Sequence, residues 1–232
     1  MADERYARQV MLPEIGEEGQ RRLASSSVLL VGLGGLGSAV APILAGAGVG
    51  RIGLCDHDTV SWSNLPRQTL YTEEEVGRPK CEAALRRLAA LSSATRFECH
   101  AEGLTPANAE RLVAAYDLVV DCCDNFATRY LLDDACAAAE RPWVYGSIGP
   151  FEGQASLFNH RRGVRYADLY PDREALCSAP RRTLGVLGSV PAAIGAIEAT
   201  EALKLLAGME PSLDGRLFVL DLKNMQCETI AL

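Results

Sequence analysis

Between residues 25 and 149 the chain alternates short apolar runs with longer segments that have the hydrophobic period of a helix, and this alternation most constrains its fold. The apolar runs include VLLVG (28–32), RIGLCD (51–56) and DLVVDC (117–122). The last is almost continuously apolar, as strands buried on both faces of a parallel sheet tend to be. This order of strand and helix predicts an α/β protein with a doubly wound, mainly parallel sheet.

The pattern changes after Gly149. The segment GQASLF (153–158) predicts a further strand, and residues 159–183, which are polar and contain proline and arginine, predict a long loop. Residues 185–208 are rich in small side chains and predict a long helix ended by Gly208. The final stretch, GRLFVLDLKNMQCETIAL, predicts two short strands. We therefore expect a mixed or antiparallel C-terminal extension of the sheet.

Composition and charge exclude several classes of protein. A hydrophobic share of 48% and a charged share of 23% are typical of a globular chain. The net charge of −7 argues against nucleic acid as a partner. No apolar run has membrane-spanning length, and MADERYARQV carries charges where a signal peptide needs an apolar core, so we expect a cytoplasmic protein with no membrane contact. The eight cysteines form no C-x-x-C pair, which favours buried, reduced thiols over a zinc site or a disulfide framework.

The stretch VGLGGLGSA (31–39) follows the first expected strand and precedes a helix. Its glycines Gly32, Gly34 and Gly37 form the pattern G-x-G-x-x-G. Glycines at this spacing permit a tight turn, the close approach of a phosphate and close packing of the helix. The helix that follows contains Pro42, which we expect near its first turn, where proline is best tolerated.

Asp56 lies 19 residues after Gly37, at the end of the second expected strand. An acidic side chain in this place can accept hydrogen bonds from ribose hydroxyls. NAD enzymes and other adenosine-binding proteins share both features. The glycine loop and Asp56 therefore predict a Rossmann-like site for an adenine nucleotide and leave NAD and ATP open.

Further polar residues follow the expected strands at the same edge of the sheet. Arg67 lies in a short polar loop after the second strand, Lys80 begins the next helix, and Asp124 comes just beyond the strand DLVVDC. The carboxyl ends of strands in a doubly wound sheet border one crevice. Two cations and a carboxylate suit a magnesium-bound triphosphate, because the cations neutralise phosphate oxygens and the carboxylate holds the metal.

Each of these residues also has a simpler interpretation. Taken alone, an arginine such as Arg67 is more often a solvated surface residue, and a lysine such as Lys80 is more often a charge on an exposed helix face. Asp124, taken alone, is more often an N-cap ahead of Phe126. Their joint placement is what favours ATP.

Six segments follow one another along the chain in a characteristic order: RYARQ (5–9), GLGGLG (32–37), LCDHDTVSWSNLPRQ (54–68), VGRPK (76–80), DCCDN (121–125) and GVLGSVPAAIGAIEATEALKLLAG (185–208). In this order they resemble the family of ThiF, MoeB and HesA, the bacterial relatives of ubiquitin-activating enzymes. This resemblance implies ATP-dependent adenylation of the C-terminal glycine of a ubiquitin-like sulfur carrier of the ThiS or MoaD type, which ends in Gly-Gly. Pyrophosphate would leave, and sulfur transfer from a persulfide donor would follow in a thiamine, molybdopterin or related pathway.

The resemblance also implies a single adenylation domain over residues 1–232. It would comprise an N-terminal helical segment (1–24), a nucleotide-binding core (25–149) and a part with the crossover loop, the long helix and the last strands (150–232).

Roles for individual residues follow from the same resemblance. Arg8 matches an arginine that family dimers supply to the partner's active site, which requires a homodimer; the alternative is an exposed arginine on an N-terminal helix. Arg67, Lys80 and Asp124 would act in catalysis, with Asp124 associated with Mg²⁺. The nucleotide would contact Gly34, Gly35, Leu36, Gly37, Asp56, Asp58, Asn64, Arg67, Gln68, Lys80, Asp124 and Asn125.

The chain departs from the family pattern in two places. Many relatives bind zinc through two C-x-x-C pairs, but the first region reads VRYADLYPD here and no second pair precedes Leu232, so zinc is not expected. Relatives also often place a cysteine just before the GVLG segment, where this chain has Arg181, with Cys177 four residues earlier. Cys177 is either a thiol that receives the activated carrier, with a pKa lowered by Arg173, Arg181 and Arg182, or an ordinary loop cysteine.

Two other functions compete with adenylation. An NAD-linked oxidoreductase would use the same glycine loop, but the three histidines are scattered and form no paired motif. A non-catalytic ATP-binding scaffold would keep the fold without turnover. The joint presence of Arg8, Arg67, Lys80 and Asp124 argues against the scaffold.

Overall fold

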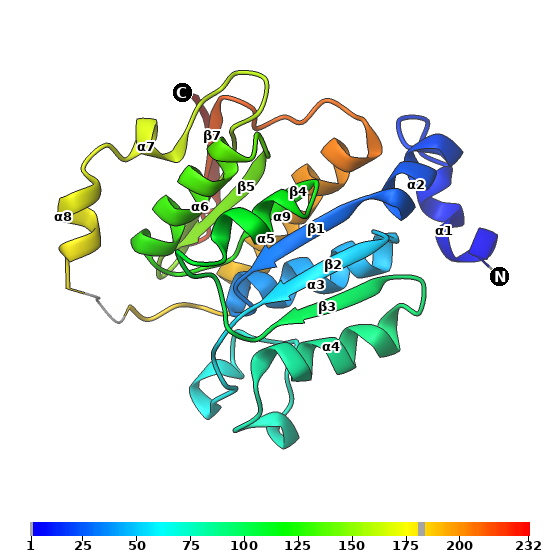
Figure 1. Ribbon diagram of the computed structural model, residues 1–232, viewed down its shortest axis with the longest axis horizontal. Coiled ribbons are helices and arrows are strands. Elements are labelled where there is room, and N and C mark those ends of the chain that lie inside the picture. The colour runs from blue at the N-terminus through cyan, green and yellow to red at the C-terminus, as the bar shows by residue number, and fades with distance from the viewer. Residues whose placement is uncertain (1, 181–183) are drawn as a thin grey trace.

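The computed structural model describes residues 2–180 and 184–232, and within them eight strands form one sheet in the order β3-β2-β1-β4-β5-β6-β7-β8 (Figure 1). The first five strands pair in parallel, and the last three join antiparallel to their neighbours. This confirms the predicted doubly wound, mainly parallel sheet with an antiparallel C-terminal extension. The strands are β1 Ser27–Val31, β2 Arg51–Cys55, β3 Arg96–His100, β4 Leu118–Asp121, β5 Trp143–Ile148, β6 Glu152–Phe158, β7 Arg216–Asp221 and β8 Gln226–Ala231.

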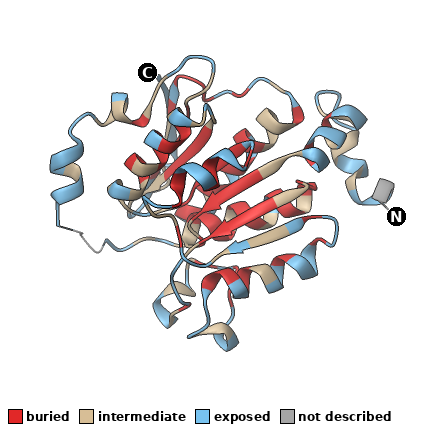
Figure 2. Cartoon of the chain, viewed as in Figure 1, coloured by how far each residue is buried: buried red, intermediate tan, exposed pale blue. Residues whose placement is uncertain are grey.

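Helices cover both faces of the sheet, and each face has its own apolar core. Alternate residues of β1 point to opposite sides, so that Val28 and Leu30 join one core and Leu29 and Val31 join the other. Figure 2 shows that the central strands are almost entirely buried. The first core packs under α3 (Gly35–Ala47), α4 (Lys80–Leu91) and α9 (Ser189–Ala207), and the second under α5 (Ala109–Ala114), α6 (Phe126–Ala138) and α7 (Tyr166–Leu169).

Two further helices, α1 (Ala2–Val10) and α2 (Gly16–Ser25), lie beside the amino end of β1 (Figure 1). The ring of Tyr6 lies against Gly48, where φ is +88° and a Cβ would be 2.7 Å from the ring. The helical N-terminal segment therefore packs at the amino ends of the parallel strands, whereas the glycine loop lies at their carboxyl ends. No helix in the described ranges has the length and apolarity needed to cross a membrane.

Pro42 corrects one expectation. The helix α3 begins at Gly35, because the glycines themselves form its first turn, and Pro42 therefore lies inside the helix. Proline has no N–H to donate to the carbonyl four residues earlier, so it weakens a helix interior. Burial of one side of α3 against α9 offsets this loss.

Residues 159–180, the described part of the segment predicted as a loop, are more ordered than a loop. They contain α7 and a second short helix, α8 (Arg173–Ser178). The Asp172 side chain caps α8 by accepting a hydrogen bond from the amide of Ala175 at 3.2 Å. Local capping of this kind is weakly encoded by hydrophobic period, which explains why the pattern predicted a loop. The long helix also begins later than expected, at Ser189, although it does end at Gly208, where φ is +86°.

The cysteines are all free thiols. The expectation of burial is correct for Cys55, Cys81, Cys122 and Cys136 and wrong for three others. Cys123 is partly buried. The exposed thiols are Cys99, Cys177 and Cys227, which lie on the edge strands and on α8.

Candidate functional site

The glycine loop connects β1 to α3, and its glycines Gly32 and Gly37 leave no room for a side chain. Gly32 has a φ of +96°, and a Cβ there would lie 2.5 Å from the carbonyl oxygen of Cys122. A Cβ on Gly37 would overlap the carbonyl oxygen of Gly32. Gly34 is the N-cap of α3 and leaves the first amides of this helix directed toward the carboxyl edge of the sheet. Amides at a helix N-terminus favour bound anions such as phosphate.

Asp56 joins the end of β2 to this loop. One carboxylate oxygen accepts a hydrogen bond from the amide of Leu33 at 2.7 Å, and the other accepts one from the amide of Asp58 at 2.8 Å. These bonds hold the carboxylate beside the glycine loop, in the position from which an acidic residue binds ribose in dinucleotide folds.

The loop after β2 places Gln68 against the glycines. Gln68 is buried, its Nε2 would lie 3.6 Å from a Cβ on Gly34, and its Oε1 has no hydrogen-bond partner in the described part of the chain. Asn64 accepts a hydrogen bond from the amide of Ser61 at 3.1 Å, and Arg67 donates one to the carbonyl of Ser63 at 2.8 Å. Arg67 is thus half-buried and tied to its own loop, rather than solvated on an open surface.

Lys80 is only 5% exposed, so the interpretation as a charge on an exposed helix face is wrong. Its Nζ lies 2.9 Å from Oδ2 of Asp58, and its amide donates to the carbonyl of Asp58, also at 2.9 Å. A short antiparallel bridge between Thr59 and Pro79 brings the two segments together. The amino end of α4 is thereby packed against the loop after β2, and the lysine stem is covered.

The carboxyl end of β4 lies next to the carboxyl end of β1, where the glycine loop begins. Val31 and Asp121 are register partners, and the amide of Cys122 donates to the carbonyl of Val31 at 2.7 Å. Asn125, rather than Asp124, is the N-cap of α6 and accepts a hydrogen bond from the amide of Thr128 at 2.9 Å. The N-cap interpretation of Asp124 is therefore wrong. Asp124 is exposed, and it follows Cys122 and Cys123, whose backbone lies against Gly32 of the glycine loop.

Behind this end lies a buried polar cluster that the sequence interpretation missed. Asp121 and Arg129 form an ion pair at 3.1 Å, with both side chains nearly inaccessible. Glu198 of α9 is fully buried, and neither of its carboxylate oxygens has a hydrogen-bond partner within the described ranges. Burial, together with the nearby carboxylate of Asp121, raises the pKa of Glu198 well above its usual range, which favours the protonated form of this side chain. The sequence signal for Glu198 was a charged residue in the predicted helix 185–208, whose side chains are mostly small and apolar.

Arg8 does not lie with the other predicted residues. It is exposed on α1, and its neighbour Gln9 donates a hydrogen bond to the carbonyl of Ala47 at 3.0 Å, at the far end of α3. A helix of 13 residues is about 20 Å long, so this contact is a full helix length from the glycine loop. The Arg8 of one chain therefore lies at the opposite edge of the sheet from the site of the same chain.

Cys177 is exposed on α8. Arg173, which was expected to lower its pKa, instead forms an ion pair with Asp134 at 2.6 Å and stacks over the ring of Tyr130. The other two arginines of that expectation, Arg181 and Arg182, lie outside the described residues.

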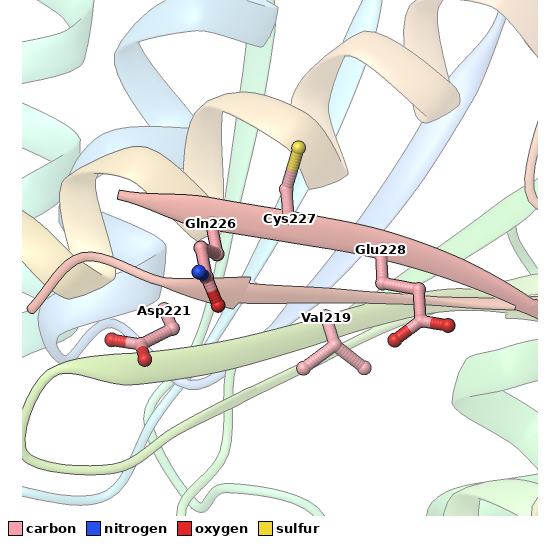
Figure 3. Close-up of a pocket in the computed structure, with 5 residues that line it drawn as sticks. All are labelled: Val219, Asp221, Gln226, Cys227 and Glu228. Carbon is pink, nitrogen blue, oxygen red and sulfur yellow. The ribbon is translucent and has the colours of Figure 1, made fainter. Parts of the chain in front are cut away.

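The last hairpin carries a hollow of about 400 Å³. Figure 3 shows the residues that line it: Val219, Asp221, Gln226, Cys227 and Glu228. The hairpin of β7 and β8 is separated from β1 by β4, β5 and β6. None of the predicted site residues lies in this hollow.

A glycine loop at a helix N-terminus, an acidic residue after the second strand and a buried lysine, all at one edge of a parallel sheet, are features of nucleotide-binding α/β proteins. The ThiF family model matches residues 6–232, and the chain therefore belongs to the ThiF family.

Its relatives include a sulfur carrier protein adenylyltransferase of Thermus thermophilus, which is 45% identical over 94% of this chain and 83% of the relative. The probable adenylyltransferase/sulfurtransferase MoeZ of Mycobacterium tuberculosis is 43% identical over 98% of this chain. The chain spans 59% of the length of MoeZ and 48% of the length of the pig adenylyltransferase and sulfurtransferase MOCS3, to which it is 46% identical. Among solved structures, Escherichia coli MccB with ATP superposes with a TM-score of 0.85 at 23% identity, over 98% of this chain and 71% of MccB, and shares the fold.

Proposed function

We propose that this chain adenylates the C-terminal glycine carboxylate of a small ubiquitin-like sulfur carrier that ends in Gly-Gly, with ATP as the nucleotide. The names of the Thermus, Mycobacterium and pig relatives support adenylyl transfer, and the Thermus relative is named for a sulfur carrier. The observation that carries the proposal is the buried ammonium of Lys80 at the edge of the sheet where α3 begins. A cation in this place suits a triphosphate better than a hydride donor.

The reaction needs no general base. A C-terminal carboxylate is ionised at neutral pH and attacks the α-phosphorus of ATP, and the bond from that phosphorus to the departing pyrophosphate breaks. The protein's contribution is to position the two reactants and to neutralise phosphate charge. Lys80 and Arg67 would exchange their present partners, Asp58 and the carbonyl of Ser63, for phosphate oxygens.

The residues at the β4 end fit a magnesium ion that enters with ATP. Mg²⁺ prefers a few carboxylate ligands together with phosphate oxygens and water, and the exposed carboxylate of Asp124 can supply one such ligand. Bound there, Mg²⁺ would neutralise charge that develops on the pyrophosphate. Asn125 is engaged as a helix cap and would support this segment through the backbone.

We further propose a homodimer in which Arg8 of one subunit acts in the site of the other. The exposure of Arg8 at the edge of the sheet opposite its own glycine loop supports this arrangement. The protein would need no zinc, and residues 1–232 would act as one adenylation domain that passes the activated carrier to a persulfide donor. The eight free thiols suit a cytoplasmic location, where thiols stay reduced.

Cys177 remains a proposed acceptor of the activated carrier. Its exposure on α8 supports access for a carrier. Mass spectrometry of enzyme, carrier and ATP should detect a covalent adduct that is absent in Cys177→Ala. An unchanged rate of sulfur transfer in Cys177→Ala would remove this residue from the mechanism.

Exchange of radiolabel between pyrophosphate and ATP tests the proposed function. Exchange should require a carrier that ends in Gly-Gly and should be absent with the same carrier lacking its last glycine. ATP binding without exchange for any such carrier would favour the non-catalytic scaffold. Binding of NAD in preference to ATP would favour the oxidoreductase.

A further inference from the structure

We propose that Arg129 is a positioning residue that fixes the segment between β4 and α6 and thereby sets the place of Asp124. This inference rests on the proposed role of Asp124 in the function above. It concerns a group that touches neither nucleotide nor carrier and acts only through the backbone.

The guanidinium of Arg129 joins three parts of the protein. Its Nε donates to Oδ2 of Asp121 at 3.1 Å, and its Nη2 donates to the carbonyl oxygens of Cys123 at 2.9 Å and of Gly146 at 3.0 Å. The guanidinium also stacks over the ring of Tyr145, 5.2 Å from the ring centre. Arg129 therefore connects α6 with the end of β4, with the following loop and with the neighbouring strand β5.

Asp121 holds the same loop from its other side. Its Oδ1 accepts a hydrogen bond from the amide of Cys123 at 2.9 Å. The amide of Cys123 donates to Asp121, and its carbonyl accepts from Arg129. Both backbone groups of Cys123 are thus hydrogen-bonded to the same buried ion pair. Asp124 follows directly, and the next residue, Asn125, is held as the N-cap of α6. The exposed carboxylate of Asp124 lies between two anchored residues, which is the arrangement that limits its motion.

The chemistry of the cluster requires arginine at this position. A guanidinium presents donors in a planar fork and can bond one carboxylate and two carbonyls at once, whereas an ammonium at the end of a lysine stem is a compact point charge. Glu198 lies against Gly146, close enough that a Cβ on Gly146 would overlap its carboxyl group. The guanidinium of Arg129 is paired with the carboxylate of Asp121 at 3.1 Å, so the buried cation has its counter-charge within the same cluster.

The variants Arg129→Lys and Arg129→Met test this role, with Arg165→Met as a matched control. Arg165 forms an ion pair at 2.9 Å with the buried carboxylate of Asp133, on the same helix α6 but away from the glycine loop. Its loss should lower the unfolding temperature without changing the site.

Two measurements separate positioning from a general loss of stability. The first is the Mg²⁺ concentration that half-saturates pyrophosphate exchange. It should rise at least tenfold in Arg129→Met, about threefold in Arg129→Lys and not at all in Arg165→Met. The second is amide hydrogen exchange of residues 122–125, which should become at least tenfold faster in Arg129→Lys while β6 stays as protected as in the wild type.

The outcomes distinguish this inference from the function on which it rests. If Asp124→Asn loses exchange activity but a folded Arg129→Lys keeps both the wild-type Mg²⁺ requirement and wild-type amide protection at 122–125, the positioning role is wrong. If Asp124→Asn keeps full exchange activity, the proposed role of Asp124 is wrong instead. Amide exchange needs no turnover, so unchanged protection in Arg129→Lys overturns the inference even if Arg129→Met does not fold or the wild type shows no exchange activity.

Discussion

The Nζ of Lys80 lies 2.9 Å from Oδ2 of Asp58, yet the lysine side chain is 6% exposed and the aspartate side chain 58%. The cation is therefore held in place by its buried stem, while its present partner faces solvent. A buried ammonium needs a negative partner, and Asp58 supplies it from the solvent side. Under the proposed function, phosphate oxygens would take over this role from the carboxylate.

Replacing Lys80 by methionine should lower kcat for pyrophosphate exchange at least about 100-fold, because a phosphate contact of this kind acts mainly on the transition state. The apolar stem is retained, so the unfolding temperature should change little. Steady-state kinetics and thermal unfolding check both points, with Lys223→Met as an exposed control. Full exchange activity in Lys80→Met would exclude the phosphate role.

Asp124→Asn should raise the Mg²⁺ requirement and lower exchange about 100-fold, because an amide is a weaker ligand for this cation than a carboxylate. Stability should be unchanged, since the Asp124 side chain is exposed. Titration of exchange activity with Mg²⁺ measures the effect. As a control, Asp134→Asn should behave as the wild type in this titration; Asp134 is an exposed aspartate of α6 that pairs with Arg173.

Two glycines of α3 should respond in opposite ways to alanine. In Gly37→Ala the new methyl overlaps the carbonyl oxygen of Gly32, so ATP affinity should fall and the free energy of unfolding should decrease by about 1–3 kcal/mol. A methyl group on Gly46 would meet no atom within 4 Å beyond its chain neighbours and the adjacent backbone of its own helix, and Gly46→Ala should increase that free energy by about 0.5–1 kcal/mol. Urea unfolding and ATP titration check the pair, and equal effects at both sites would contradict the close packing of the glycine loop.

Glu198→Gln should change how stability depends on pH. The pKa of Glu198 is raised in the folded state by burial and by the nearby Asp121, with Arg129 opposing the shift, and Cys122 is the other ionisable group that faces it. Above the usual glutamate pKa the unfolded chain releases this proton and the folded chain keeps it, so the contribution of Glu198 is greatest in acid and is lost as the pH rises.

Glutamine is neutral in both states and lacks this loss. The variant should therefore gain stability relative to the wild type as the pH rises from 5 to 8, by at most about 1.4 kcal/mol per pH unit. Urea unfolding at several pH values measures the difference. Parallel pH profiles for the two proteins would show that Glu198 is ionised in the fold.

Mixing two inactive variants tests the role of Arg8 in the partner site. Arg8→Ala and Lys80→Met should each be inactive as homodimers. A mixed dimer has one site with both residues intact, and random mixing should restore about a quarter of wild-type activity, given a symmetric dimer. No recovery on mixing, with mixed dimers shown to form, would place both residues in one chain's site or remove Arg8 from catalysis.

The succession of strands and helices along the chain and the place of the glycine loop were predictable, because both depend on local patterns. The run at 117–122 is apolar whichever way the rest of the chain packs, and Gly32 and Gly37 are required by backbone contacts within one strand–helix unit. The burial of Lys80 was not predictable, because it depends on the bridge between Thr59 and Pro79. In the sequence, a lysine at the start of an amphipathic helix has the pattern of a surface charge.

The buried pair of Asp121 and Arg129 was missed for a related reason. Asp121 ends the strand β4 and Arg129 lies in the first turn of α6, where charged residues are usually solvated. The pair is buried through tertiary packing, which includes the pairing of β5 with β4. Pro42 was misplaced because hydrophobic period does not show where α3 begins. Local capping by Asp172 likewise formed α8 where composition predicted a loop.

The strand β5 pairs in parallel with β4 on one side and antiparallel with β6 on the other. Every residue proposed to contact the nucleotide precedes Ile148, the last residue of β5, whereas the strands beyond it supply none of them. Replacement or lengthening of the last three strands would therefore leave the nucleotide edge intact. The sheet therefore has two parts that meet at β5. The antiparallel part can change in sequence and length, and so in the partners that it contacts, while the parallel part keeps the residues proposed to bind the nucleotide.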